Sequence, residues 1–186
     1  MQWSPVQIGE HGLLLAANSD WITEYVRTHF QAAEAEGGPG APADLTVTVS
    51  DGYGQPFNGF VVETSCRDGC AQFKRNDYLV RYSPALNQAE VQVRDDFALK
   101  HALMNLYSAF IVHREWGLLI HSSCIVEQGR AYLFAGQSGA GKSTAARLSL
   151  PRLVLSDEAT VVKVAQGQAT VFNSPFRSGL EADWSV

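Results

Sequence analysis

Nine consecutive residues, GQSGAGKST from Gly136 to Thr144, have the types and spacing of a phosphate-binding loop. Glycines let the backbone fold into a concave nest whose N–H groups point at phosphate oxygens, which side chains would otherwise block. Lys142 can place its ammonium on the β- and γ-phosphates of a nucleotide, and the hydroxyl of Ser143 can reach a Mg²⁺ ion. The residues predicted to bind the nucleotide are Gly136, Gln137, Ser138, Gly139, Ala140, Gly141, Lys142, Ser143 and Thr144.

An acidic pair, Asp157 and Glu158, follows this loop at the end of a short apolar run, Leu153–Leu155. In open α/β sheets, ligands bind outside the carboxyl ends of the strands. One of the two carboxylates is therefore predicted to bind the Mg²⁺ of a nucleotide, and the other can accept the proton of an attacking hydroxyl. The alternative is that the two acidic residues only begin a solvated turn and have no role in binding or catalysis.

His121 is a weaker candidate. Like the acidic pair, it follows an apolar run, Leu118–Ile120, and so lies at the end of a predicted strand. Its imidazole could orient an acceptor or bind a phosphate oxygen. A structural histidine bonded to Ser122 or Ser123 would look the same in the sequence.

The elements that must position these residues can be read from the flanking patterns. Residues 131–135 are typical of a buried strand before the loop, and residues 144–148 of a helix after it. Strands are also predicted at 117–120, 123–127 and 153–155. A long helix is predicted from Phe97 to Trp116, with Asp95 and Asp96 as capping candidates and Gly117 at the C-cap position.

The front part, residues 1–94, is predicted to be a small α+β unit, and residues 95–186 a nucleotide-binding domain. A helix is expected from Trp21 to Ala35, followed by a flexible Gly- and Pro-rich connection at 36–43. Alternating or apolar runs predict strands at 45–49, 59–64, 78–82 and 89–93.

Composition limits the classes of protein that remain. The 186 residues carry 14 Lys and Arg against 19 Asp and Glu, for a net charge of −5, so a broad surface for nucleic acid is not expected. Cys66, Cys70 and Cys124 fit neither a disulfide framework nor a zinc ribbon, and we expect reduced thiols. Since no apolar run approaches the ~20 residues that span a bilayer, a cytoplasmic protein without membrane contact is predicted.

Three blocks in order resemble the catalytic domain of HPr kinase/phosphorylase and related proteins. They are Leu119–Cys124 with its histidine, the loop from Gly136 to Ser143, and Leu155–Glu158 with its acidic pair, where the family has Asp-Asp. The segment Val171–Phe176 resembles the extended segment that follows in related kinases. The resemblance implies a mixed-sheet P-loop fold shared with phosphoenolpyruvate carboxykinases. It also implies transfer of a phosphate from Mg²⁺-bound ATP to a Ser or Thr hydroxyl of a protein or peptide.

On this interpretation the catalytic residues are Lys142, Asp157 and His121, Mg²⁺ is held by Ser143 and Glu158, and the cofactors are ATP and Mg²⁺. The partner is a protein or peptide acceptor, and a homo-oligomer is possible. Three alternatives stay open: a non-catalytic ATP-binding regulatory module, a fragment of a larger kinase, and a small-molecule or carboxykinase-like enzyme. Only 28 residues follow Glu158, so the kinase part is expected to be incomplete at its C-terminal end.

Overall fold

The computed structural model describes residues 1–33, 38 and 40–185, and it forms a mixed α/β protein with two sheets. The chain divides into two compact units, Met1–Phe110 and Ile111–Val186. The division falls inside helix α2 (Asp96–His113), whereas the sequence-based boundary lies just ahead of that helix.

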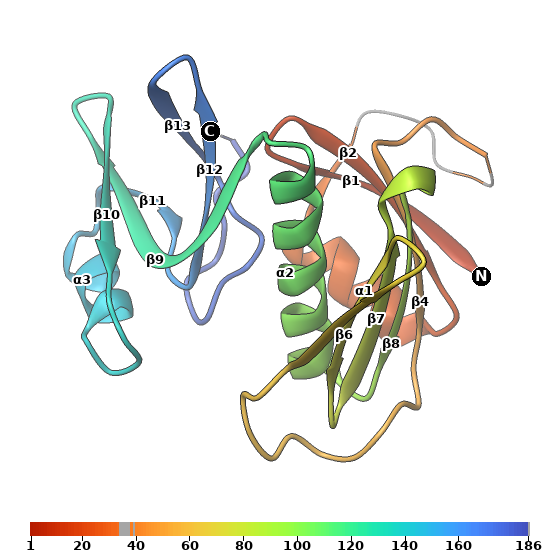
Figure 1. The fold of residues 1–186 in the computed structure, drawn as a ribbon. Coiled ribbons are helices and arrows are strands. Elements are labelled where there is room, and N and C mark those ends of the chain that lie inside the picture. The colour runs from red at the N-terminus through yellow and green to blue at the C-terminus, as the bar shows by residue number, and fades with distance from the viewer. Residues whose placement is uncertain (34–37, 39, 186) are drawn as a thin grey trace. The chain divides into compact units, whose positions relative to one another are not determined.

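The first unit is built on a sheet whose strand order is β3-β1-β2-β4-β8-β7-β6-β5 (Figure 1). Strand β4 pairs in parallel with β2 and with β8, and the remaining described pairings are antiparallel. The strands are β1 (Gln2–Ile8), β2 (His11–Ala17), β3 (Gln31–Ala32), β4 (Leu45–Ser50), β5 (Glu63–Arg67), β6 (Cys70–Arg75), β7 (Tyr78–Ser83) and β8 (Gln88–Val93).

The core of this unit forms where α2 packs on the sheet, with α1 (Asp20–His29) against β1 and β2. Apolar residues of α2, among them Leu99, Leu106 and Phe110, are fully buried, and burial of such side chains is the main driving force for this packing. Two hydrogen bonds fix the helix on the strands. Tyr107 donates to the carbonyl of Ile8 at 2.9 Å, and Asn105 donates to the hydroxyl of Tyr78 at 2.6 Å.

Several predicted elements of this unit are confirmed, namely the strands at β4, β7 and β8 and a helix that begins near Trp21. That helix ends earlier than predicted, because Phe30 is extended and the chain enters β3 to pair with β1. The predicted helix end at Ala35 and part of the predicted connection at 36–43 lie outside the described residues.

Other parts of the first unit differ from the prediction. The strand predicted at 59–64 lies instead at β5, since pairing with β6 begins only at Glu63, and Phe60 and Val61 are exposed. Strands β1, β2 and β6 were not predicted. Cys66 and Cys70 are exposed free thiols on β5 and β6.

The second unit is organised around one long strand, β9 (Gly117–Glu127). Its sheet has the order β10-β9-β12-β13, with β11 also paired to β9, and all of its described pairings are antiparallel. The other elements are β10 (Arg130–Ala135), α3 (Lys142–Leu148), β11 (Leu153–Ser156), β12 (Ala159–Ala165) and β13 (Gln168–Phe172).

The long helix ends earlier than predicted, ahead of β9. Helix α2 ends at His113, and Glu115 adopts the left-handed conformation that was predicted for Gly117. Gly117 matters for a different reason, because a Cβ there would lie 2.1 Å from the carbonyl oxygen of Val162, so only glycine permits the close approach of β9 to β12. The two strands predicted at 117–120 and 123–127 are one continuous strand, and α3 begins at Lys142 rather than Thr144.

The prediction that the strand before the glycine-rich loop is buried was wrong. All six residues of β10 are exposed, including Tyr132, Leu133 and Phe134. Strand β10 also lies at the edge of its sheet, where among the described residues only β9 pairs with it.

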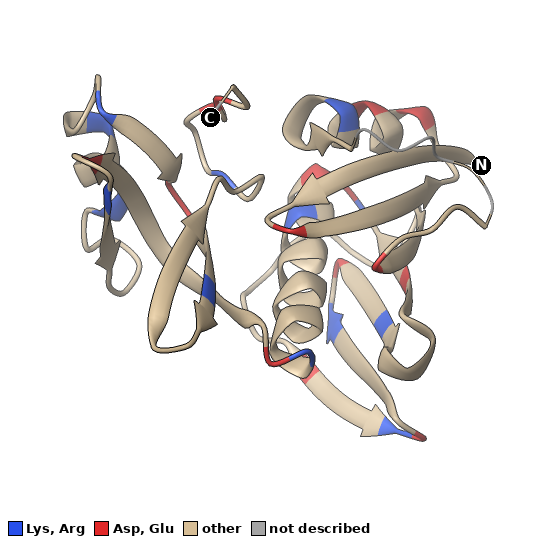
Figure 2. Ribbon diagram, turned by 90° about the horizontal axis from the view of Figure 1, so that it is seen from above, with Lys and Arg blue, Asp and Glu red and all other residues tan. Residues whose placement is uncertain are grey.

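Two surface features bear on possible partners. Lys and Arg are dispersed over both units along the part of the chain that the structure describes, rather than gathered on one element (Figure 2). No helix among the described residues has the length and apolar character needed to cross a membrane.

Candidate functional site

The register of β9 brings the glycine-rich loop and the acidic pair together. Ser122 of β9 lies opposite Ala135, the last residue of β10, and on its other side its N–H donates to the carbonyl of Glu158 at 3.1 Å. One strand therefore separates the start of the loop from the acidic pair. Since neighbouring strands lie 4.7–4.9 Å apart, the two segments begin about 10 Å from each other.

Strand direction explains why the two segments meet at the same end of the sheet. Both β10 and β11 run antiparallel to β9, so their carboxyl ends point the same way. The loop leaves β10 at this end, and Asp157 with Glu158 forms the connection between β11 and β12, which pair with the same edge of β9.

The loop itself is shaped by left-handed backbone and by its lysine. Gly139 and Gly141 have φ angles of 81° and 88°, which other residues adopt only with strain. The ammonium of Lys142, which is largely buried, donates to the carbonyls of Gly136 and Gln137, at 2.9 Å in each case. The lysine thus folds back over the loop from the first turn of α3.

Two hydroxyl groups tie the start of α3 to the sheet. Ser143 donates to the backbone carbonyl of Asp157 at 3.0 Å, and Ser123 donates to the backbone carbonyl of Lys142 at 2.7 Å. A cavity of about 300 Å³ opens above this junction. It is lined by His121, Ser138, Gly139, Gly141, Lys142, Ser143, Thr144, Asp157, Glu158 and Ser178.

A buried hydroxyl cluster supports the floor of the site. Thr160 accepts from Ser122 at 2.7 Å and lies 2.5 Å from the hydroxyl of Ser156, and all three residues are fully buried. Because each buried hydroxyl has a partner, the cluster fixes the backbone on both sides of the acidic pair without an unsatisfied polar group.

The carboxylate of Asp157 is buried and accepts four hydrogen bonds from one segment, 178–180. One oxygen accepts from the N–H of Ser178 at 3.0 Å. The other accepts from the hydroxyl of Ser178 at 2.9 Å, the N–H of Gly179 at 2.9 Å and the N–H of Leu180 at 3.1 Å. The predicted proton acceptor therefore already faces a serine hydroxyl.

The other predicted residues have their places in the same cavity. Glu158 is half-buried and lines the cavity, and His121 is exposed at the position of β9 that pairs with Ala159. The structure thus brings together the loop lysine, Ser143, the acidic pair and His121.

Sequence reasoning missed the segment that follows Phe176, which begins with Arg177. This guanidinium donates to the carbonyls of Val154 and Leu155, at 2.9 Å in each case, and to the side chain of Asn173 at 2.6 Å. Burial lowers the pKa of Arg177, and the negative charge of Asp157 opposes that shift. The only local signal was an arginine followed by a serine and a glycine, a pattern too common to indicate a site.

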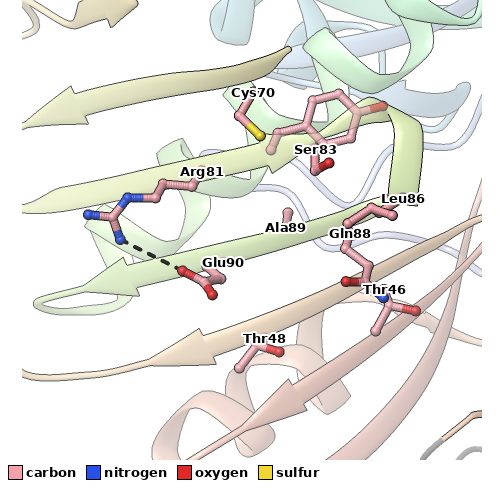
Figure 3. Close-up of a pocket in the computed structure, with 10 residues that line it drawn as sticks. Thr46, Thr48, Cys70, Arg81, Ser83, Leu86, Gln88, Ala89 and Glu90 are labelled. Atoms are coloured by element: carbon pink, nitrogen blue, oxygen red, sulfur yellow. Dashed lines mark ion pairs between the residues drawn. The ribbon is translucent and has the colours of Figure 1, made fainter. Parts of the chain in front are cut away.

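A second cavity of about 420 Å³ lies on the sheet of the first unit and contains none of the predicted residues (Figure 3). Its lining includes Thr46, Thr48 and Cys70, and an exposed ion pair joins Arg81 to Glu90 at 3.7 Å. Such an exposed pair contributes little to stability, and the lining carries no arrangement typical of catalysis.

The fold and the site define a mixed α/β protein with a glycine-rich loop between a strand and a helix, faced by an acidic pair. Residues 86–183 match the family model described as SynChlorMet cassette protein ScmC, a span of 98 of the 186 residues. The chain belongs to this family. The matched span contains every residue of the candidate site. No curated protein matches the chain.

Proposed function

We propose that this chain binds Mg²⁺-ATP and transfers its γ-phosphate to a Ser or Thr hydroxyl of a protein or peptide, with the P-loop kinase fold that the resemblance to HPr kinase implies. The observation that carries the proposal is the shared cavity of Lys142, Ser143, Asp157 and Glu158. A phosphate-binding lysine, two metal-binding side chains and a proton acceptor are the groups that phosphoryl transfer requires.

The loop is suited to phosphate because its cationic group is held by weak partners that phosphate can replace. Lys142 donates to two neutral carbonyls, and a phosphate oxygen is a stronger acceptor for an ammonium. The left-handed glycines leave the concave face of the loop free of side chains. We therefore assign Lys142 and the loop N–H groups to the β- and γ-phosphates.

The oxygen donors of the site fit Mg²⁺ bound together with a nucleotide. Among the described residues, no three His, Cys, Asp or Glu side chains are grouped as a dedicated metal site. Mg²⁺ in nucleotide sites commonly takes one or two protein oxygens together with phosphate oxygens and water. Ser143 and Glu158 would hold it, and the ion would neutralise charge that develops on the phosphates.

In the proposed step, the acceptor hydroxyl oxygen attacks the γ-phosphorus and the bond from that phosphorus to the β,γ-bridging oxygen breaks. ADP leaves, and the hydroxyl proton passes to the carboxylate of Asp157. A hydroxyl already lies 2.9 Å from this carboxylate, within the 2.6–3.2 Å range required of a general base. His121, exposed at the rim, would contact the acceptor or the transferred phosphate.

The second candidate function is a nucleotide-binding module without transfer. It is favoured by the full engagement of Asp157, whose two oxygens accept four hydrogen bonds within the chain. In that case the carboxylate serves only to hold the segment 178–180.

The test measures binding and transfer separately on the full chain. Binding of a fluorescent ATP analogue with Mg²⁺ reports affinity, and γ-labelled ATP with a panel of peptide and metabolite acceptors reports transfer. We expect Lys142→Ala to weaken binding by about 10- to 100-fold, because a charge-assisted hydrogen bond contributes roughly 1.5–3 kcal/mol. Lys163→Ala is the matched control, because Lys163 lies on β12 beside Trp116 and does not line the cavity.

Asp157→Asn tests the role of Asp157 as the proton acceptor, with transfer expected to stop while ATP still binds. Equal affinity of Lys142→Ala and the parent would overturn the phosphate-loop assignment. ATP binding without transfer to any acceptor would favour the binding module. Transfer by Asp157→Asn at the parent rate would show that the base assignment is wrong.

A further inference from the structure

We propose that Ser178 is a phosphate acceptor of this chain's own site, so that the protein phosphorylates itself on this residue. The inference rests on the proposed function and adds a specific acceptor to it. It starts from the hydrogen bond between the Ser178 hydroxyl and Asp157, which lies in the same cavity as the loop lysine.

The hydroxyl of Ser178 has the surroundings that an acceptor needs. It donates to the carboxylate of Asp157 at 2.9 Å, so the group that would take its proton is already in place. Ser178 is itself exposed and lines the cavity with Lys142 and Ser143, so a bound phosphate could approach its oxygen from the solvent side. Holding a reactant beside the catalytic group is a large part of what an enzyme contributes.

The segment is anchored on both sides of Ser178, which keeps the hydroxyl at this position. On one side, Arg177 bonds the carbonyls at the end of β11. On the other, Leu180 packs against a small apolar cluster of Ile125, Ala146 and Val154. These contacts do not involve the Ser178 hydroxyl, which is bonded to the carboxylate of Asp157 beside the N–H groups of the same segment.

The other serines near the C-terminal end lack this arrangement. The side chain of Ser174 is fully buried and accepts a hydrogen bond from the N–H of Phe176. Ser185 is exposed and donates to a carboxylate, Asp183, at 2.6 Å, but neither residue lines the cavity. Ser185 is therefore a matched control: a serine bonded to a carboxylate away from the loop.

The bonds that form and break in this self-phosphorylation are the same as in the proposed transfer to a protein or peptide. The Ser178 oxygen forms a bond to the γ-phosphorus of ATP, the bond to the bridging oxygen breaks, and ADP leaves. The proton of the hydroxyl goes to Asp157, leaving a phosphoserine beside a neutral carboxylic acid that returns the proton to water.

The experiment incubates the full chain with Mg²⁺-ATP and measures the intact mass, followed by peptide fragmentation. Cleavage after Arg177 gives a peptide that contains both Ser178 and Ser185, and its fragments distinguish the two sites. We expect one added phosphate, on Ser178. Ser178→Ala should abolish the modification, Ser178→Thr should retain it, and Ser185→Ala should leave it unchanged.

A mixing experiment tests whether the reaction occurs within one chain. A tagged Lys142→Ala chain keeps Ser178 but should not be modified when mixed with the parent chain, and the modification rate of the parent should not depend on protein concentration. Phosphate on Ser185 or elsewhere would overturn the inference, and so would transfer from the parent to the tagged chain. ATP binding and peptide transfer without phosphate on Ser178 would overturn it while leaving the proposed function standing. Absence of ATP binding would overturn both.

Discussion

Replacing Asp157 by alanine would remove the acceptor of four hydrogen bonds and release the segment 178–180. A hydrogen bond to a charged group contributes roughly 1.5–3 kcal/mol. The donors on Ser178 and Gly179 belong to exposed residues and regain water when the carboxylate is lost, so the total is smaller than the sum. We expect Asp157→Ala to lower the free energy of unfolding of the second unit by about 2–4 kcal/mol.

Asp157→Asn should lower the free energy of unfolding less, by about 1–2 kcal/mol. The amide oxygen of the variant can still accept from the donors that share one carboxylate oxygen in the parent. The amide group would then face the N–H of Ser178, so that bond is lost. We therefore expect stability to decrease from the parent chain to Asp157→Asn and further to Asp157→Ala.

Two measurements check this prediction. Urea unfolding of the full chain, followed by tryptophan fluorescence, gives the change in stability, and hydrogen exchange at the amides of Gly179 and Leu180 reports the segment directly. Asp183→Ala is the control, because its exposed carboxylate accepts from Ser185 and supports no buried segment, and it should leave the unfolding transition where it is. Unchanged stability and unchanged exchange in Asp157→Ala would refute the view that this carboxylate holds the segment.

Two further predictions concern buried groups. Arg75 and Asp77 form a buried pair at 2.6 and 2.8 Å in the first unit, so Arg75→Ala should cost about 3–5 kcal/mol in urea unfolding by leaving a buried charge unpaired. Arg81→Ala, from an exposed pair, should cost about 0–1 kcal/mol, and equal costs would contradict the prediction. Burial raises the pKa of the Cys124 thiol from 9.0 to about 11, so the folded state holds this proton more tightly than the unfolded state. Stability should therefore fall as the pH rises from 9 towards 11, and a Cys124→Ala chain with the same pH dependence would show that the thiol is not its source.

Local patterns in the sequence predicted which segments of the chain form the candidate site. The glycine-rich loop, the strand before it, the helix after it and the acidic pair after β11 are each encoded by neighbouring residues, and each lies in the predicted segment of the chain. Strands β4, β7 and β8 were likewise predicted from their own periodicity. Strands β1, β2 and β6 were missed because their alternation is weak, even though β1 with β2 and β6 with β7 pair between neighbours in the chain. Strand β12, which pairs with the distant β9, was also not predicted.

The sequence by itself determined which groups could bind phosphate and metal, because such motifs depend on residue types at fixed short spacings. Only the tertiary structure decided that β9 runs unbroken between the loop and the acidic pair, that β10 lies exposed at an edge, and that Asp157 faces Ser178. These features depend on strand register and on contacts such as those of Ser122 with Ala135 and Glu158, and of Asp157 with Ser178. The free energy of such contacts comes from pairing and burial that no local pattern specifies.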